Sequence, residues 1–192
     1  MNNSNFLKIM KLALTLTVIC VVAGGLLALT YAATEKQIER QAKIEEMKSS
    51  REALPAVKKA DGFKLRDDLA AKARKKYKDI VKIYEGFDDG RKVGWVVQVA
   101  PRGYGGPVSF AVGVDVNGKV AGISLIENKE TPGLGQNIEK PEFRGQFEGK
   151  SESDPLQVGE DIDALTAATI SSKAMALGVR EALLALKMLG GR

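Results

Sequence analysis

The sequence predicts an α+β protein, in which a single N-terminal transmembrane helix is followed by an exported domain with a mostly antiparallel sheet packed by helices. Three observations predict this architecture. An uncharged apolar segment lies near the N-terminus, four runs rich in β-branched residues follow in the middle, and a long amphipathic segment ends the chain. The 192 residues, 44% hydrophobic and 28% charged, suit one globular domain with an appendage.

The apolar segment runs from Leu12 to Ala33 without a charged residue. At about 1.5 Å per residue, a helix of this length crosses a hydrocarbon core of about 30 Å. Lys8 and Lys11 precede it, so the positive-inside rule keeps residues 1–11 in the cytoplasm and exports everything after Thr34. A cleaved signal peptide is the competing interpretation, but the apolar run is longer than such a peptide requires. We therefore expect a retained transmembrane helix at residues 12–33.

Residues 34–78 are expected to form a helical connector to a domain at residues 79–192. Charged helix-forming residues fill the stretch from Glu35 to Arg51, Pro55 interrupts the pattern, and a second helical pattern follows. In the domain, Asp89-Gly90 and Asn117-Gly118 are strong hairpin signals between apolar runs, and they indicate antiparallel pairing. Strands are expected at residues 80–84, 93–99, 108–114 and 120–126, and a helix at residues 170–189 that ends at Gly190-Gly191.

The composition excludes several kinds of site. The chain has no histidine, so it offers no imidazole as a base or as a ligand to zinc or haem. Its one cysteine, Cys20, lies in the apolar segment, which excludes a disulfide framework and a cysteine-ligated iron–sulfur cluster. The net charge of +5 is too small to argue for nucleic acid as a partner. Redox chemistry here would need an organic cofactor, because we expect neither a metal site nor a catalytic constellation of side chains.

Three segments could bind a ligand, although each also has a purely structural explanation. Glycines at residues 103–107 suit a hairpin loop, or the close approach of a flat ligand. The segment from Glu130 to Gly135 suits a rigid turn, but Glu130, Thr131 and Leu134 also supply an acceptor, a hydroxyl and an apolar contact. At residues 163–172, Thr169 or Ser171 could be a helix N-cap, or the helix start could hold a phosphate beside Thr169.

These motifs and their order resemble the FMN-binding domain family, and most closely the G subunit of the Rnf complex, the ion-translocating ferredoxin:NAD oxidoreductase. The resemblance rests on Tyr104-Gly-Gly-Pro107, on Glu130-Thr-Pro-Gly-Leu-Gly135, and on a terminal motif that comprises Asp163, Thr166, Ala168 and Thr169. It implies an FMN bound covalently as a phosphoester to Thr169. One departure is Ala167, which stands where the family commonly has glycine.

The resemblance also implies the roles of the other site residues. Glu130, Thr131, Leu134 and Gly135 are expected around the flavin, and Thr166, Ala168 and Ser171 at its phosphate end. A separate magnesium-dependent flavin transferase would cleave FAD and pass FMN to Thr169, and Asp163 would help to recruit or position that enzyme.

The implied function is one-electron relay by a redox subunit of a translocase, with no complete active site of its own beyond the flavin. Its partners would be membrane subunits that carry another flavin and iron–sulfur centres, in a complex that couples electron flow to ion movement across the cytoplasmic membrane. The alternatives are the related C subunit of the sodium-translocating NADH:quinone reductase, a free-standing flavin shuttle, and a membrane-tethered adaptor domain without redox function.

Overall fold

The computed structural model describes residues 3–59 and 61–190. The chain divides into two units, Met1–Ile44 and Glu45–Arg192. The helix α1 (Asn3–Ala53) contains the whole first unit that is described and supplies the first residues of the second.

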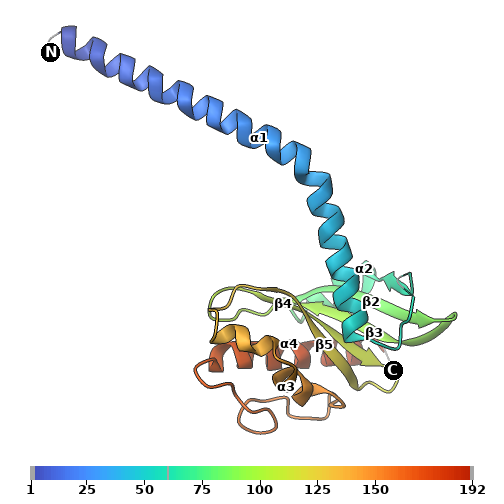
Figure 1. The fold of residues 1–192 in the computed structure, drawn as a ribbon. Helices are drawn as coiled ribbons and strands as arrows, with labels where there is room; N and C mark the ends of the chain where they lie inside the picture. The colour runs from blue at the N-terminus through green and yellow to red at the C-terminus, as the bar shows by residue number, and fades with distance from the viewer. Residues whose placement is uncertain (1–2, 60, 191–192) are drawn as a thin grey trace. The chain divides into compact units, whose positions relative to one another are not determined.

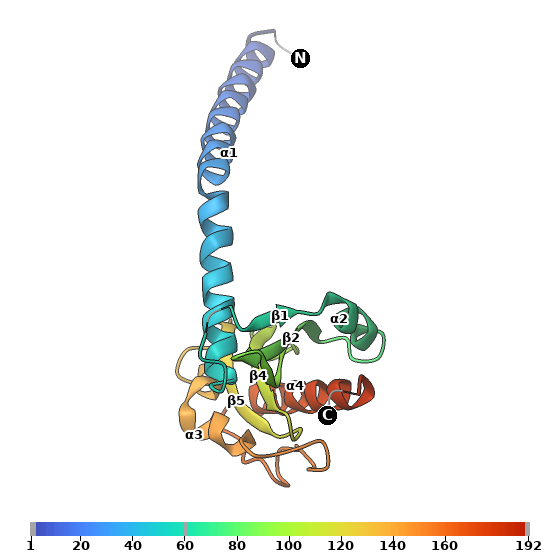
Figure 2. The ribbon, with the colours of Figure 1, turned by 90° about the vertical axis from the view of Figure 1, so that its right-hand side faces the viewer.

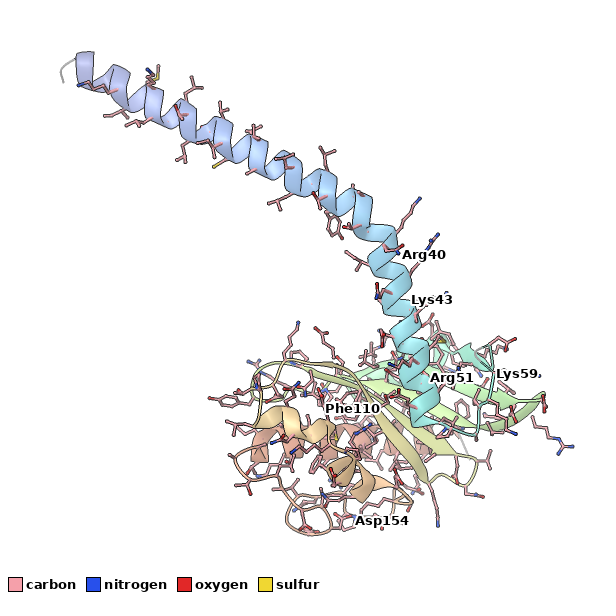
Figure 3. All side chains as sticks on the ribbon, viewed as in Figure 1. Arg40, Lys43, Arg51, Lys59, Phe110 and Asp154 are labelled. Atoms are coloured by element: carbon pink, nitrogen blue, oxygen red, sulfur yellow. The ribbon has the colours of Figure 1, made fainter. Side chains whose placement is uncertain are left out.

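In the first unit, α1 is long and apolar enough to cross a membrane, and it is the only such helix in the described part of the chain. Its large apolar side chains, from Leu12 to Leu29, are more than half exposed. In the view of Figure 3, side chains project from both edges of this helix. Such a surface is unfavourable in water and favourable in lipid, which agrees with the expected transmembrane helix.

The expected helical connector at residues 34–78 is only partly helical. Helix α1 ends at Ala53, two residues before Pro55, because proline disfavours the helical conformation of the residue that precedes it. The short strand β1 (Phe63–Leu65) and the helix α2 (Asp67–Arg74) follow, and β1 pairs with the next strand. A strand of three residues is too short to show an alternating pattern, so the sequence did not reveal it.

The second unit is built on a five-stranded sheet in the order β1-β2-β3-β4-β5, with every neighbouring pair antiparallel. The prediction of a mostly antiparallel sheet is thus confirmed, and the four expected strands are all present. Asp89 and Gly90 have positive φ in the β2–β3 turn, as does Gly118 in the β4–β5 turn. The strands after β1 are β2 (Ile80–Asp88), β3 (Arg91–Val99), β4 (Val108–Asp115) and β5 (Val120–Asn128).

Both faces of the sheet are covered. Alternate residues of a strand point to opposite faces, so Trp95 and Val97 pack on the same side as the helix α4 (Thr169–Met188), whereas Val96 packs with Leu54 just after α1. In Figures 1 and 2, α4 (red) runs along one face of the sheet. Phe110, labelled in Figure 3, is fully buried in the larger core between the sheet and α4.

Between β5 and α4 the chain forms only short helical elements: η1 (Gly135–Glu139), α3 (Pro141–Arg144) and η2 (Gly145–Phe147). A long irregular segment then leads to α4, whose position agrees with the predicted terminal helix. Gly190 follows the helix with a φ of 71°, as expected of a C-terminal glycine, and Gly191 lies outside the described residues.

Candidate functional site

A pocket of about 430 Å³ lies at the N-terminal end of α4. The three segments that the sequence singled out meet there, because the β3–β4 loop, the β5–η1 loop and the start of α4 all contribute to its wall. Its volume falls in the range of small-molecule sites, about 300 to 1,000 Å³. The lining residues are Tyr104, Glu130, Thr131, Leu134, Gly135, Ala167, Ala168, Thr169, Ile170 and Ser171.

The buried carboxylate of Glu130 joins the three segments. Its Oε1 accepts hydrogen bonds from the backbone N–H groups of Tyr104 (2.7 Å) and Gly105 (3.1 Å). Its Oε2 accepts a hydrogen bond from the Ser171 hydroxyl (2.8 Å). Bonds to a charged acceptor are among the stronger ones in proteins, so Glu130 stabilises the arrangement of all three loops. Its role is therefore to position the walls of the pocket, which the sequence alone did not reveal.

Glycines let the loops approach this carboxylate. A Cβ atom added at Gly103 or at Gly135 would overlap the Glu130 side chain, so a larger residue at either position would displace it. Gly135, expected as a cofactor contact, thus also has a structural reason to be glycine.

The loop from Thr131 to Leu134 is a tight turn. The Thr131 carbonyl accepts hydrogen bonds from the backbone N–H groups of Leu134 and Gln136, both at 3.2 Å. The bond between Thr131 and Leu134 closes a turn whose central residues are Pro132 and Gly133, and Gly133 has a φ of 76°. Proline followed by a residue with positive φ is the pattern of a type II turn. The rigid turn predicted from the sequence is present, and it places Leu134 on the rim of the pocket.

Ala167 occupies a second turn of the same kind, just before α4. The Ala168 N–H donates to the Leu165 carbonyl at 3.0 Å, and Ala167 has a φ of 60°. Glycine adopts this left-handed conformation without strain, whereas the Cβ atom of alanine costs about 1 kcal/mol or more there. The structure therefore gives a physical reason to expect glycine at this position, and it shows that alanine can occupy the turn.

The first turn of α4 has no side-chain cap. The N-cap position is Ala168, so the interpretation of Thr169 or Ser171 as the N-cap is wrong. In the described part of the chain, the backbone N–H groups of Thr169, Ile170 and Ser171 have no acceptor. Unpaired amides and the positive end of the helix dipole favour an anion at this point.

The hydroxyl groups around this helix start differ in their availability. Ser171 is buried and donates to Glu130, and Ser172 is buried and donates to the Ala168 carbonyl. Thr166 and Thr169 are exposed, and their hydroxyls have no hydrogen bond within the described residues. Of these two, only Thr169 lines the pocket. Among the hydroxyls at this helix start, Thr169 is therefore the one that is free to meet a ligand in the pocket.

Apolar side chains form the rim of the pocket: Tyr104 is 73% exposed, Ile170 53% and Leu134 45%. They supply the contact that a flat aromatic ring requires. Sequence reasoning did not single out Tyr104, Ala167 or Ile170 as contact residues; Tyr104 lay in a segment already marked by its glycines, and no local signal distinguished Ile170. Two of the expected site residues, Asp163 and Thr166, lie outside the lining.

Fold and site together define a ligand-binding α+β domain that follows an apolar helix, with an anion position and an aromatic-ring surface in one pocket. Residues 103–184 match the sequence model of the FMN-binding domain, and they include every residue that lines the pocket. Residues 1–52 match the model of the RnfG N-terminal region.

Three relatives match over most of the chain. The G subunit of the proton-translocating ferredoxin:NAD(+) oxidoreductase complex of Clostridium ljungdahlii is 34% identical, over 91% of this chain and 90% of that protein. The G subunit of the Na(+)-translocating complex of Acetobacterium woodii is 33% identical, over 89% and 88%. The G subunit of the ion-translocating oxidoreductase complex of Methanosarcina acetivorans is 33% identical, over 88% and 89%.

Among solved structures, Shewanella oneidensis NqrC aligns with 67% of this chain and 66% of that chain, at 20% identity and a TM-score of 0.46. The sequence relatives decide the family: the chain belongs to the G subunits of the Rnf complexes, the ion-translocating ferredoxin:NAD+ oxidoreductases.

Proposed function

We propose that this chain is the electron-transfer subunit of an ion-translocating ferredoxin:NAD+ oxidoreductase complex, and that it carries FMN bound as a phosphoester to Thr169. The relatives carry the first part of the proposal, because each is named as the G subunit of such a complex. The observation that carries the second part is the Thr169 hydroxyl, which is exposed, without a hydrogen bond in the described chain, and on the wall of the pocket.

The residues of the pocket fit FMN. The unpaired amides of Thr169, Ile170 and Ser171 would hold the phosphate, and the rim of Tyr104, Leu134 and Ile170 would contact the ring. Thr131 and Gly135 also line the pocket. When bound, FMN supplies the electron transfer, and the protein supplies position and electrostatics.

The bond is a phosphoester that another enzyme makes. The Thr169 oxygen would attack the FMN phosphorus of FAD, the pyrophosphate bond would break, and AMP would leave while the hydroxyl proton is released. The described residues offer no base of their own for this step: the only carboxylate among those that line the pocket is Glu130, which already accepts three hydrogen bonds. A separate flavin transferase is consistent with this arrangement.

Ser171 and Glu130 would act indirectly. The Ser171 hydroxyl donates to Glu130, so Ser171 would reach the phosphate through its backbone N–H instead. Ala168, at the N-cap, would shape the phosphate end with its backbone. Asp163 and Thr166 are outside the lining, so their role would be in recognition by the transferase rather than in holding the bound flavin.

We propose that the N-terminus faces the cytoplasm and that the FMN domain lies on the extracytoplasmic side of the cytoplasmic membrane. Lys8 and Lys11 support this topology, because they precede the apolar part of α1. A reporter active only after export, fused after Arg51, should be active. Activity of a cytoplasm-only reporter at the same position would overturn the topology. The partners would be the other Rnf subunits, which bear flavin and iron–sulfur centres.

The attachment is tested by Thr169→Ala in cells that contain the transferase. The variant should lose the flavin fluorescence that survives denaturation of the protein band, because only covalent flavin remains bound. It should still fold, and the free energy of unfolding should change by less than about 0.5 kcal/mol, because Thr169 makes no capping bond that the substitution could remove.

Ser171→Ala is the matched control two positions further into the helix. It leaves Glu130 without one of its donors, so it should lower stability by about 1 to 3 kcal/mol while the fluorescent band persists. Thr169→Ala should thus lose the attached flavin and keep its stability, whereas Ser171→Ala should keep the flavin and lose stability. A fluorescent band in Thr169→Ala would refute the attachment site, and its absence from the wild-type chain would favour the adaptor alternative.

A further inference from the structure

A second cavity, of about 310 Å³, lies along α4 beyond the first, and the two share no lining residue. Its floor is apolar, and Leu177 on α4 remains 48% exposed although the helix otherwise buries most of its apolar side chains. The lining residues are Leu156, Gln157, Val158, Lys173, Ala176, Leu177 and Arg180, which we call the α4 groove.

The two cations of the α4 groove are unpaired. Lys173 and Arg180 are exposed and form no ion pair or hydrogen bond with their side chains in the part of the chain that the structure describes. The next basic residue along the same stripe, Lys187, does form an ion pair, with Glu152 at 3.3 Å. The groove therefore combines an apolar floor with two free positive charges, and a complementary partner carries carboxylates around an apolar side chain.

The groove lies on the same face of α4 as Thr169. With 3.6 residues per turn, positions four and eleven residues later return to within about 40° of Thr169, which places Lys173 and Arg180 on its side of the helix. Along the helix axis they are about 6 Å and about 17 Å from Thr169, at about 1.5 Å per residue.

An enzyme that modifies Thr169 must cover this region. A typical specific protein interface takes about 800 Å² of each partner, equivalent to a disc of about 16 Å radius. A disc centred on Thr169 includes Lys173, and Arg180 lies at its edge, where a long side chain can meet the partner. The described residues offer no free base beside Thr169, so the modifying enzyme must bring its own catalytic groups to this surface.

We propose that the α4 groove docks the flavin transferase that esterifies Thr169, through an acidic segment of that enzyme with an apolar side chain over Leu177. The inference rests on the proposed covalent flavin and adds the surface by which the modifying enzyme recognises this chain. Lys173 and Arg180 act in recognition and are not catalytic.

The test measures the initial rate of flavin attachment. The full chain is purified in detergent from cells without the transferase and is mixed with purified transferase, FAD and Mg²⁺. Attachment is followed as fluorescence of the denatured band. The variants are Lys173→Glu, Arg180→Glu and the double variant. The control is Lys119→Glu, which makes the same change of charge as each single variant at an exposed lysine in the β4–β5 turn.

The double variant should slow attachment about tenfold through a higher KM for the chain, since charges at an interface mainly steer association. It should reach the same final flavin content. Higher salt should slow the wild type and Lys119→Glu by screening the attraction, but it should not slow the double variant, whose two glutamates repel the acidic segment. Unfolding curves from Trp95 fluorescence identify any folding defect, and Lys173→Gln with Arg180→Gln then repeats the test without charge reversal.

A rate in the double variant equal to that of Lys119→Glu would overturn the proposal. Unchanged attachment with slower electron transfer in the assembled complex would also overturn it, because the groove would then dock an electron-transfer partner. If Thr169→Ala still accepts flavin, the attachment site itself fails, and that result is independent of the groove variants.

Discussion

Ala167→Gly tests whether the turn that precedes α4 is strained. Ala167 has a φ of 60° in this turn, where a residue without Cβ is unstrained. Its side chain is exposed, so the substitution removes little packing. We expect the glycine variant to be more stable than the wild type, which is the opposite of the usual effect of replacing alanine by glycine.

The expected magnitude is the difference between two effects. Relief of the left-handed conformation contributes about 1 to 2 kcal/mol, and the greater freedom of glycine in the unfolded chain offsets about 0.4 to 1 kcal/mol of it. The difference is about 0 to 1.6 kcal/mol, so the free energy of unfolding should rise by about 0.8 kcal/mol. Ala164→Gly is the matched control, because Ala164 is exposed in the same segment and is not among the residues with positive φ. It should lower the free energy of unfolding by about 0.4 to 1 kcal/mol.

Urea unfolding of the full chain in detergent measures both variants. The chain has one tryptophan, Trp95, which is 6% exposed in the core of the second unit and therefore reports the unfolding of that unit. Attachment of flavin to Thr169 should continue in both variants, because neither removes the hydroxyl. If Ala167→Gly lowered the free energy of unfolding as much as Ala164→Gly does, the strain that we assign to Ala167 would be absent.

Two further predictions concern the cofactor loop and the core. Gly133→Val places a β-branched residue at a φ of 76° with open space around it. Strain alone should therefore lower the free energy of unfolding by about 1 to 2 kcal/mol, and the displaced loop should shift the absorption spectrum of the bound flavin. A wild-type spectrum and wild-type turnover in this variant would remove the loop from the cofactor site. Burial and the nearby Asp79 carboxylate raise the pKa of Glu181, so the folded state binds this proton more tightly and stability falls as pH rises from about 4.5 through the raised pKa. Glu181→Gln should remove this loss of stability with rising pH, so the variant should be more stable than the wild type at neutral pH. If the stability of the variant and of the wild type changed equally with pH, the prediction would be wrong.

The sequence determined the elements whose signals are local. Strands β2 to β5 alternate apolar residues between clear hairpin turns, and α4 repeats its apolar positions with the helical period, so each could be located without the others. The signal for the helix that is long and apolar enough to cross a membrane was equally local, because length and absence of charge define it. The order of the three motifs indicated the FMN-binding family before any geometry was known.

Contacts between distant segments were decided only by the tertiary structure. The carboxylate of Glu130 bonds to Tyr104 and Gly105 before it in the chain and to Ser171 after it, and no spacing in the sequence records that these loops meet. Burial then separates the hydroxyl of Ser171, which is engaged by Glu130, from that of Thr169, which is free at the pocket.

Contacts between distant segments also explain the features that could not be located from the sequence. The strand β1 is too short for a period and exists through its pairing with β2, and the left-handed conformation of Ala167 is imposed by a turn that must deliver the chain to α4. Local patterns thus determined which elements form, because each element satisfies its own backbone. The packing of separate loops decided which side chains form hydrogen bonds within the pocket wall and which remain available to bind a ligand, because these bonds depend on neighbours far away in the sequence.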